Sequence, residues 1–417
     1  MLRHTLAGCV LLLVCNTSSP ADQWNAFRGP DGNGRASVNG LPTEWSETDN
    51  VVWRQAVPGQ GWSSPVVNDG TIYITAAVPT TAASSDNELS LQLLAFDATT
   101  GELLNNVEVF QQRDAAVPRI HQKNGHASPT PLIRGNRIYV HFGHQGTACL
   151  DTKGKVLWRN RSLTYQPVHG NGGSPILVGD ALIFSCDGGS TTFIVALDAE
   201  TGDVRWKTDR KTDANKKFSF STPTLITVAG QQQVISAGSN VVCAFNPVDG
   251  TEIWRLRYDG YSVIPKPVFA NGLVFVSTGY NRPSLLAIRP DGKGDVTETH
   301  LVWQTNRSVP HTSSLLVIDE ELFMVSDNGV ASCLDARTGT VHWSERVGGT
   351  FSASPFYANG LIYLQDEDGK ATVLKASTKY GLVSTNEIGE RTLASYGVTG
   401  KALLVRSDKH LYRIEAR

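Results

Sequence analysis

The sequence predicts an all-β protein folded as an eight-bladed β-propeller of four-stranded antiparallel blades. One phrase recurs along most of the chain, at spacings between 40 and 64 residues, and each copy holds short apolar runs separated by turn residues. Such a period is typical of propellers, because one four-stranded blade cannot bury both of its faces without neighbours. Among 417 residues, 40% are hydrophobic and 18% charged, with 39 Gly and 19 Pro, which excludes collagen, coiled coils and wholesale disorder.

Residues 1–21 are expected to be a signal peptide. A positively charged start is followed by an apolar run from Leu6 to Val14 and by small and polar residues up to Ala21. The run is about half of a membrane span, so no transmembrane segment is expected in the mature chain. We therefore expect an exported protein, periplasmic or secreted. A lipid anchor at Cys9 or Cys15 is the less favoured alternative, because neither cysteine has the flanking residues of a lipoprotein cleavage site.

Residues 22–50 are expected to form an N-terminal arm that packs along the outside or bottom of the ring, and residues 51–417 to form the propeller. The last copy of the phrase begins near Ala394 and stops without a fourth strand. The run Val51 to Trp53 has the pattern of that missing strand. We expect the N-terminal strand to pair with the C-terminal blade and close the ring, which gives eight blades, with seven as the alternative.

Each copy of the phrase starts with a small residue and Pro, continues through an apolar strand that ends on Asp, and closes on Thr-Gly and Trp. The third copy shows Ser174-Pro175, then Asp198, Thr201-Gly202 and Trp206. The Asp is expected to accept turn N–H groups while Gly supplies a positive φ, and the Trp to pack between blades. The Pro of the phrase, or the residue equivalent to it, recurs at 65, 129, 175, 223, 267, 315 and 355, and Trp recurs at 158, 206, 254 and 303.

The cysteines and histidines of the mature chain show no spacing typical of a metal site. Cys149, Cys186, Cys243 and Cys333 are separated by 37, 57 and 90 residues, and each lies in or beside an apolar run. We expect buried single thiols rather than a disulfide framework. No metal site is predicted. Hydrolase and nucleotide-binding motifs such as GxSxG, the P-loop and GxGxxG are absent; a glycosidase with its two acids on different blades stays an alternative.

The phrase from Ala196 to Trp206, Ala-Leu-Asp-x-x-Thr-Gly-x-x-x-Trp, resembles the pyrroloquinoline-quinone (PQQ) type propeller repeat, and the resemblance spans residues 51–415. This repeat occurs in quinoprotein alcohol and glucose dehydrogenases and in non-enzymatic relatives such as the lipoprotein subunit that helps assemble outer-membrane proteins. The resemblance therefore implies the fold and leaves both functions open. The dehydrogenases of this family carry an adjacent cysteine pair and offer a Glu/Asn/Asp set to a calcium ion. This chain has no adjacent cysteines and no CxxCH haem site, and the catalytic Asp of those enzymes cannot be mapped onto a matching motif in it.

The candidate ligand-binding residues lie in the loops that enter the first strand of each blade, since these loops share one face around the channel. Aligning the copies on Pro places Lys123, His169, Lys217 and Tyr261 at equivalent positions of four successive blades. We expect an anion or polar-ligand pocket there; Asp187, Asp327, Asp366 and Asp368 could pair with its bases. The full candidate set is Lys123, His126, His169, Lys217, Tyr261, Lys266 and His311.

The charge balance limits the class of partner. With 37 Lys and Arg against 39 Asp and Glu, the net charge is −2, so no nucleic-acid partner is expected. The sequence favours a non-enzymatic binding or assembly scaffold without a cofactor, which recognises a protein partner or a small anionic or polar ligand at the channel mouth. The alternative is a quinoprotein-type oxidoreductase that uses PQQ with calcium on alcohols or sugars.

Overall fold

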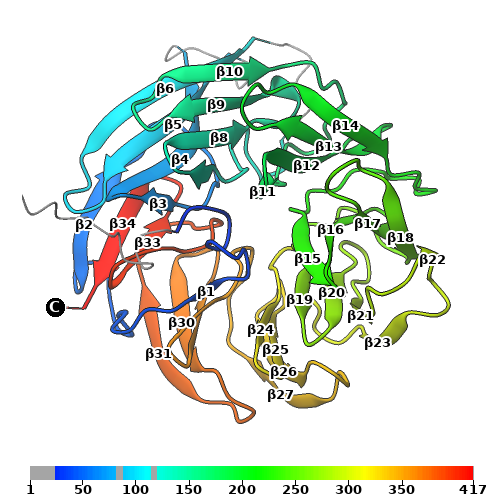
Figure 1. Ribbon diagram of the computed structural model, residues 1–417. Coiled ribbons are helices and arrows are strands. Elements are labelled where there is room, and N and C mark those ends of the chain that lie inside the picture. Colours follow the sequence, from blue (N-terminus) through cyan, green and yellow to red (C-terminus); the bar gives the residue numbers. More distant parts are fainter. Residues whose placement is uncertain (1–23, 81–87, 114–119, 417) are drawn as a thin grey trace, which may run out of the picture.

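Eight four-stranded sheets are arranged in a ring around a central channel in the computed structural model, which describes residues 24–80, 88–113 and 120–416 (Figure 1). The expected signal peptide lies outside the described residues. Within each blade the strands are antiparallel and run from the channel outward, and two short extra strands bring the described total to 34. The predicted all-β propeller and the count of eight blades are confirmed.

The strands of blades one to four have the following bounds. Blade one holds β3 (Val66–Asn68), β4 (Thr71–Pro79), β5 (Leu89–Asp97) and β6 (Leu103–Gln112); blade two holds β7 (Leu132–Arg134), β8 (Arg137–His141), β9 (Thr147–Asp151) and β10 (Val156–Asn160). A short 3-10 helix, η2 (Gly143–Gln145), joins β8 to β9. Blade three holds β11 (Ile176–Val178), β12 (Ala181–Asp187), β13 (Thr192–Asp198) and β14 (Val204–Asp209); blade four holds β15 (Thr224–Val228), β16 (Gln231–Gly238), β17 (Val241–Phe245) and β18 (Glu252–Arg257), with β22 (Gly294–Asp295) added outside β18.

Blades five to eight complete the ring. Blade five holds β19 (Val268–Ala270), β20 (Leu273–Ser277), β21 (Leu285–Ile288) and β23 (Leu301–Thr305); blade six holds β24 (Leu316–Ile318), β25 (Glu321–Val325), β26 (Val330–Asp335) and β27 (Val341–Arg346). Blade seven holds β28 (Phe356–Ala358), β29 (Leu361–Gln365), β30 (Lys370–Lys375) and β31 (Leu382–Glu387), with β1 (Arg35–Ala36) added inside β28; blade eight holds β32 (Gly397–Thr399), β33 (Ala402–Arg406), β34 (His410–Glu415) and β2 (Val51–Ala56).

A strand from the N-terminal part of the chain and three C-terminal strands close the ring in blade eight. Strand β2 pairs antiparallel with β34, with Val51 opposite Ile414 and Arg54 opposite Tyr412. The N-terminal strand is thus the outer strand of a blade whose other three strands are C-terminal. The predicted ring closure is confirmed, and it removes the open edge that an incomplete blade would expose.

The core lies between neighbouring blades, as the repeat predicts. Apolar clusters combine residues of adjacent blades, and one large cluster joins blades seven, eight and one to the N-terminal segment through Trp24 and Trp45. The repeated Trp docks on the next blade: Trp158 Nε1 donates to the carbonyl of Ala199 at 3.1 Å, and its ring covers Gly202 so closely that a Cβ there would lie 2.5 Å from it. Since Gly202 also has φ +80°, any other residue at this position would be strained as well as obstructed.

The turn chemistry and the cysteines also follow the prediction. Asp198 Oδ1 accepts the N–H groups of Glu200 at 2.8 Å and Thr201 at 3.0 Å. The four cysteines of the propeller are free and buried. Trp254 departs from the other repeats, because it donates to Gln233 Oε1 in its own blade at 2.9 Å.

The first part of the N-terminal arm lies inside the ring, which corrects the expectation that it packs along the outside or bottom. The carbonyl of Trp24 accepts from the N–H of Val67 in β3, and Asn25 accepts from Ile133 in β7. Further along, β1 pairs in parallel with β28. The segment therefore crosses the channel against the inner strands of blades one, two and seven, beside the label β1 in Figure 1. Only later does it run outward, where Asn386 Oδ1 accepts from the N–H of Trp45.

Candidate functional site

A ring of hydroxyl side chains lines the channel where the first strand of each blade begins. In seven of the eight blades, the backbone N–H of the residue two positions before the inner strand donates to the side-chain hydroxyl of the equivalent residue in the next blade, as from Ser64 to Thr130 at 3.0 Å and from Ser395 back to Ser64 at 3.2 Å. We call this set the hydroxyl girdle. Its positions, in chain order, are Ser64, Thr130, Ser174, Thr222, Lys266, Ser314, Ser354 and Ser395.

The girdle corrects the sequence alignment in blade two. Strand β7 begins at Leu132, directly after Pro131, so Thr130 is the equivalent of Ser64. The alignment on Pro129 was two residues early because both prolines follow a hydroxyl residue. Lys123 is therefore not at the position equivalent to His169, Lys217 and Tyr261, although the structure still brings it to the channel mouth.

Above the girdle lies a cavity of about 740 Å³ at the mouth of the channel. Girdle hydroxyls line its lower part together with Phe27 of the N-terminal segment, while the loops that enter all eight blades contribute residues to its walls. This volume falls in the range of about 300–1,000 Å³ that is usual for ligand pockets. The N-terminal segment thus forms the floor of the cavity, so the channel is not open at this depth.

Aromatic rings follow one another around this cavity through five consecutive blades. Each ring centroid lies between 5.2 and 5.9 Å from the next, mostly in edge-to-face contacts, which aromatic pairs prefer. Burial, together with the neighbouring His169 and Lys123, lowers the pKa of His121, so its ring is neutral at neutral pH. We call this set the aromatic arc. Its members, in order, are His121, His169, Phe218, Tyr261, Tyr280 and His311.

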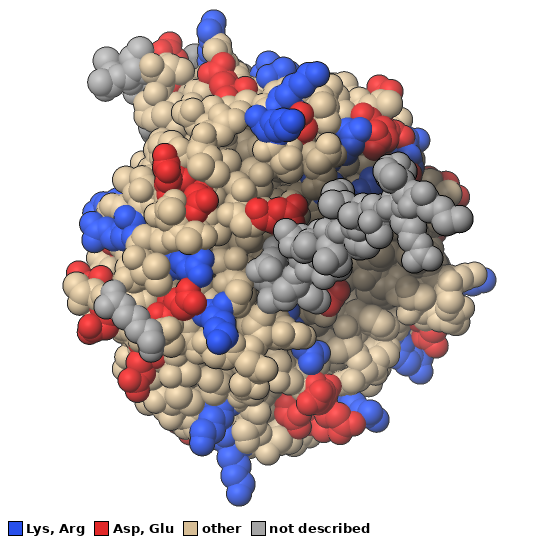
Figure 2. Space-filling model, turned by 60° about the vertical axis from the view of Figure 1, so that its left-hand side comes forward, with Lys and Arg blue, Asp and Glu red and all other residues tan. Residues whose placement is uncertain are grey.

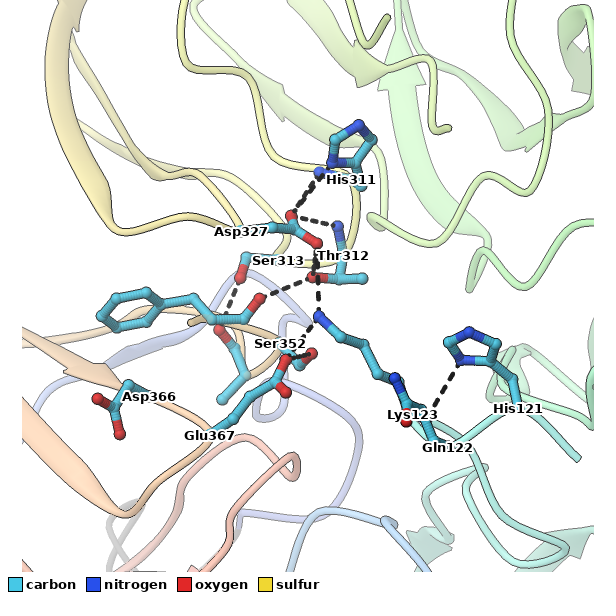
Figure 3. Close-up of polar contacts among 12 residues, drawn as sticks. His121, Gln122, Lys123, His311, Thr312, Ser313, Asp327, Ser352, Asp366 and Glu367 are labelled. Atoms are coloured by element: carbon cyan, nitrogen blue, oxygen red, sulfur yellow. Dashed lines mark hydrogen bonds and ion pairs between the residues drawn. The ribbon is translucent and has the colours of Figure 1, made fainter. Parts of the chain in front are cut away.

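A lysine from blade two reaches across the mouth of the channel to blades six and seven (Figure 3). Lys123 Nζ lies 2.7 Å from Glu367 Oε1 and 3.9 Å from Asp327 Oδ2. The neighbouring Gln122 carbonyl accepts from Arg391 Nη2 of blade eight at 2.8 Å. The loop 120–126 is therefore tied to three blades on the far side and forms part of the roof of the cavity.

Asp327 is the carboxylate around which this contact is built. Its Oδ1 accepts the backbone N–H of His311 at 2.7 Å, and its Oδ2 accepts the hydroxyl of Thr312 at 3.0 Å. Burial alone would raise its pKa, but the hydrogen bonds and charge of His311, with the charge of Lys123, outweigh burial and hold the pKa below its ordinary value. Asp327 is thus ionised at neutral pH and is matched by nearby cationic or donor groups.

The structure places the predicted site residues in two groups. Lys123, His169, Tyr261 and His311 line the cavity, whereas His126, Lys217 and Lys266 are not among its lining side chains. In place of Lys217, its neighbour Lys216 faces the cavity, where Nζ lies 4.4 Å from the centre of the Tyr261 ring and 3.1 Å from its hydroxyl. The entry loop has no strand to set its alternation, so the sequence could not distinguish the two lysines.

The predicted acidic partners are also divided. Asp327 does pair with Lys123, and the second carboxylate in contact with this ammonium belongs to Glu367. Asp366 lies apart from the ammonium (Figure 3). Its carboxylate accepts the turn N–H groups of Asp368 and Lys370. The aromatic residues Phe218 and Tyr280 were missed as site residues. The signal for Phe218 was present in the unusual run of two lysines and two phenylalanines at residues 216–220.

Asp187 lies below the surface in a buried ion pair with Arg210. The two side chains are 1% and 0% exposed, and Arg210 Nη2 lies 3.1 Å from Asp187 Oδ2. That contact does not have hydrogen-bond geometry, and the pair is joined by a bond of 3.3 Å between Nε and Oδ1. Burial, which the charge of Arg210 only partly offsets, raises the pKa of Asp187 to about 6. This residue therefore belongs to the core and does not neutralise the mouth.

Two features that the resemblance ties to the calcium and quinone site of the PQQ dehydrogenases are not found among the described residues. Within the described residues, no three His, Cys, Asp or Glu side chains come together as ligands for a metal ion. The four cysteines are single thiols, each in a different blade, so they form no adjacent pair beside a cofactor. Lys123, the central cation of the mouth, is already matched by two carboxylates.

On the face shown in Figure 2, basic and acidic residues alternate in small groups without a continuous patch of one sign. Across the part of the chain that the structure describes, no helix has the length and apolar character needed to cross a membrane.

Comparison with known proteins finds similarity of sequence and of fold. The PQQ_2 family profile, described as "Outer membrane protein assembly factor BamB", matches residues 35–117, 90–214, 191–294 and 294–384. The outer membrane protein assembly factor BamB of Yersinia pestis is 23% identical over 254 residues, which cover 48% of this chain and 64% of that protein. The matched part thus spans less than two thirds of the length of this relative.

Solved structures from both functional classes share the fold. BamB from Moraxella catarrhalis aligns with a TM-score of 0.60 and 14% identity over 87% of this chain and 96% of that chain. The quinohemoprotein alcohol dehydrogenase ADHIIG from Pseudomonas putida HK5 aligns with a TM-score of 0.62 and 11% identity over 95% of this chain and 80% of that chain. At these identities the likeness shows the fold alone.

Proposed function

This chain belongs to the PQQ_2 family described as outer membrane protein assembly factor BamB, and from this premise we propose that it is an exported, non-enzymatic scaffold. Its recognition surface is the cavity at the channel mouth, and its ligand is an extended segment of a protein partner. The targeting pattern of residues 1–21 supports export. The described residues hold no cluster of three His, Cys, Asp or Glu side chains and no adjacent cysteine pair, which favours a binding role over oxidation.

The aromatic arc is the observation that carries the proposal. Six rings from five blades give one wall of the cavity a continuous aromatic lining, and Tyr280 within it is 55% exposed. Exposed aromatic side chains of this kind are enriched at protein interfaces, since they bury a large area at a low cost in side-chain entropy. The exposed part of the Tyr280 ring does not pack in the propeller core.

The other walls suit a peptide rather than a planar cofactor. Girdle hydroxyls such as Ser174 and Thr222 face the cavity and can donate to the carbonyl groups of an extended backbone. Where the arc ends at His311, Lys123 and Asp327 also line the cavity and offer both signs of charge. An extended segment presents apolar side chains, backbone groups and occasional charges, so it matches all three walls at once.

Peptide binding to the mature protein tests this proposal. Fluorescein-labelled decapeptides are compared by anisotropy in three series: one rich in aromatic and aliphatic residues, one acidic, and one of Gly and Ser. We expect the apolar series to bind best, and Tyr280→Ser to weaken its binding about 5- to 10-fold, because one aromatic contact contributes about 0.5–1.5 kcal/mol beyond its area. The control is Tyr380→Ser, since Tyr380 is 38% exposed and packs on Trp343 in blade six.

Two outcomes contradict the proposal. One is equal binding of all three series, or equal affinity of the wild type and Tyr280→Ser. The other is obtained by adding PQQ with calcium: a bound chromophore together with dye reduction by alcohols or sugars would assign the chain to the oxidoreductases.

A further inference from the structure

Lys266 interrupts the hydroxyl girdle. The position two residues before the inner strand is a Ser or Thr in the seven other blades, and Lys266 takes it in blade five. Its backbone still donates to Ser314 Oγ at 3.0 Å. Because its side chain has no hydroxyl to accept from blade four, the girdle bond that Thr222 would donate is missing. The replacement gives up a hydrogen bond and places a cation inside the channel.

The ammonium group of Lys266 lies against the N-terminal segment where this crosses the channel. A Cβ on Gly32 would collide with Lys266 Nζ, so the absence of a side chain at Gly32 leaves the space that the ammonium fills. Gly32 also has φ +65°, which glycine adopts without strain. The site is therefore formed jointly by blade five and the N-terminal segment.

A second buried cation, Arg28, lies in the same place. Its Nη2 donates to the carbonyls of Leu315 at 2.7 Å and Asn33 at 2.9 Å, which fixes the guanidinium between the N-terminal segment and blade six. Its Nε and Nη1 are buried without a hydrogen-bond partner. Arg28 is 2% exposed and Lys266 is 6% exposed. Burial, followed by the charge of Arg28, lowers the pKa of Lys266 to about 7, so the two cations affect one another.

The described residues supply no negative charge to this pair. Neither Arg28 nor Lys266 has a carboxylate within ion-pair distance among the residues described, and Asp31, which lies close in sequence, is exposed. Removing one ion from water costs several kcal/mol even after relaxation, and a second like charge nearby raises the cost. Burying both groups in their charged forms is therefore unfavourable unless an anion accompanies them.

We propose that Arg28 and Lys266 bind a small inorganic anion of one negative charge, such as a halide, between the N-terminal segment and blades five and six. The anion accepts from the free Nε and Nη1 groups of Arg28 and from Nζ of Lys266. It is distinct from the ligand of the mouth cavity, because neither cation lines that cavity. Binding of the anion holds the N-terminal segment in the channel and so maintains the floor of the cavity.

The first test locates the anion directly. Crystals of the mature protein are soaked in sodium bromide, and an anomalous difference map is calculated at the bromine absorption edge. We expect a peak in contact with both Arg28 and Lys266. A map that shows bromide at other sites but none between these two side chains overturns the proposal.

The second test uses the hydroxyl that the other blades carry. Replacing sodium gluconate by sodium bromide at constant ionic strength is expected to raise the melting temperature of the wild type by about 2 °C or more, because a ligand of the folded state stabilises it by mass action. Lys266→Ser is expected to remove this response, whereas the exposed control Lys293→Ser keeps it. An equal bromide response of Lys266→Ser and the wild type contradicts the site. Should Lys266→Ser fail to fold, the bromide map of the wild type decides by itself.

Discussion

Removing the ammonium of Lys123 should loosen the roof of the cavity without unfolding the propeller. The substitution Lys123→Met keeps the length and apolar part of the side chain and deletes both contacts, at 2.7 Å to Glu367 and 3.9 Å to Asp327. Lys123 is 26% exposed and its partners are 13% and 20% exposed, so solvent screens the pairs only in part. We estimate a loss of about 1–2 kcal/mol for the two contacts together, near the upper end for exposed ion pairs.

This free energy stabilises the closed position of the loop 120–126. The other hydrogen bonds of the loop remain in the variant. The N–H of His121 still donates to the carbonyl of His169, and Arg391 still donates to Gln122. A change of about 1–2 kcal/mol corresponds to a 5- to 30-fold rise in the population of the open loop. Hydrogen exchange of the loop amides, resolved by mass spectrometry, should accelerate by that factor, while amides of the inner strands stay unchanged.

The control for this experiment is Lys293→Met, which removes an exposed lysine next to β22 on the outer side of blade four. Exchange in the loop should not change in this variant. The reasoning is refuted if Lys123→Met leaves loop exchange within twofold of the wild type. It is equally refuted if exchange accelerates throughout the propeller, because the contact would then support the whole fold rather than the roof.

Three further predictions concern the core and the channel. Arg210→Met leaves the Asp187 carboxylate buried without its partner and should lower the free energy of unfolding by about 3–5 kcal/mol in urea titrations. The double variant with Asp187→Leu should restore most of this loss. Trp206→Phe deletes the 3.0 Å bond from Nε1 to the Pro247 carbonyl of the next blade, and should lower stability by about 1 kcal/mol or more in the same assay. For Lys266, burial lowers the folded pKa to about 7 from the ordinary 10.5, so in halide-free buffer the unfolded chain binds more protons between these values. Stability should therefore increase with pH across that window by up to about 1.4 kcal/mol per pH unit, and this slope should vanish in Lys266→Ser if the burial of the lysine is its cause.

The ring could be predicted from the sequence because its determinants are local and repeated. Each Asp-x-x-Thr-Gly turn closes on its own N–H groups, as around Asp198, and most of the repeated Trp rings cover the equivalent Gly of the next blade, as Trp158 covers Gly202. Repetition at fixed spacing then places equivalent residues at equivalent radii. The missing fourth strand of the last copy was visible for the same reason, and β2 supplies it.

The site was predictable only as a region. The strand order of a propeller places the loops that carry the candidate residues on one face. Four of the predicted residues do line the cavity. Which of Lys216 and Lys217 faces inward depends on how an irregular loop packs, since no strand alternation sets it. The exposed Tyr280 comes from a different loop of blade five, and its contact with His311 crosses a blade boundary.

By itself, the sequence determined the number of blades, the turn chemistry, the closure of the ring and the burial of the thiols, because each depends on residues close in the chain or on their regular recurrence. Only the tertiary structure decided that the N-terminal segment enters the channel, that Lys123 spans it, and that Arg28 meets Lys266. Those contacts join residues that are far apart in sequence and belong to no repeat. Their partners are set by the distance across the ring, which no local pattern records.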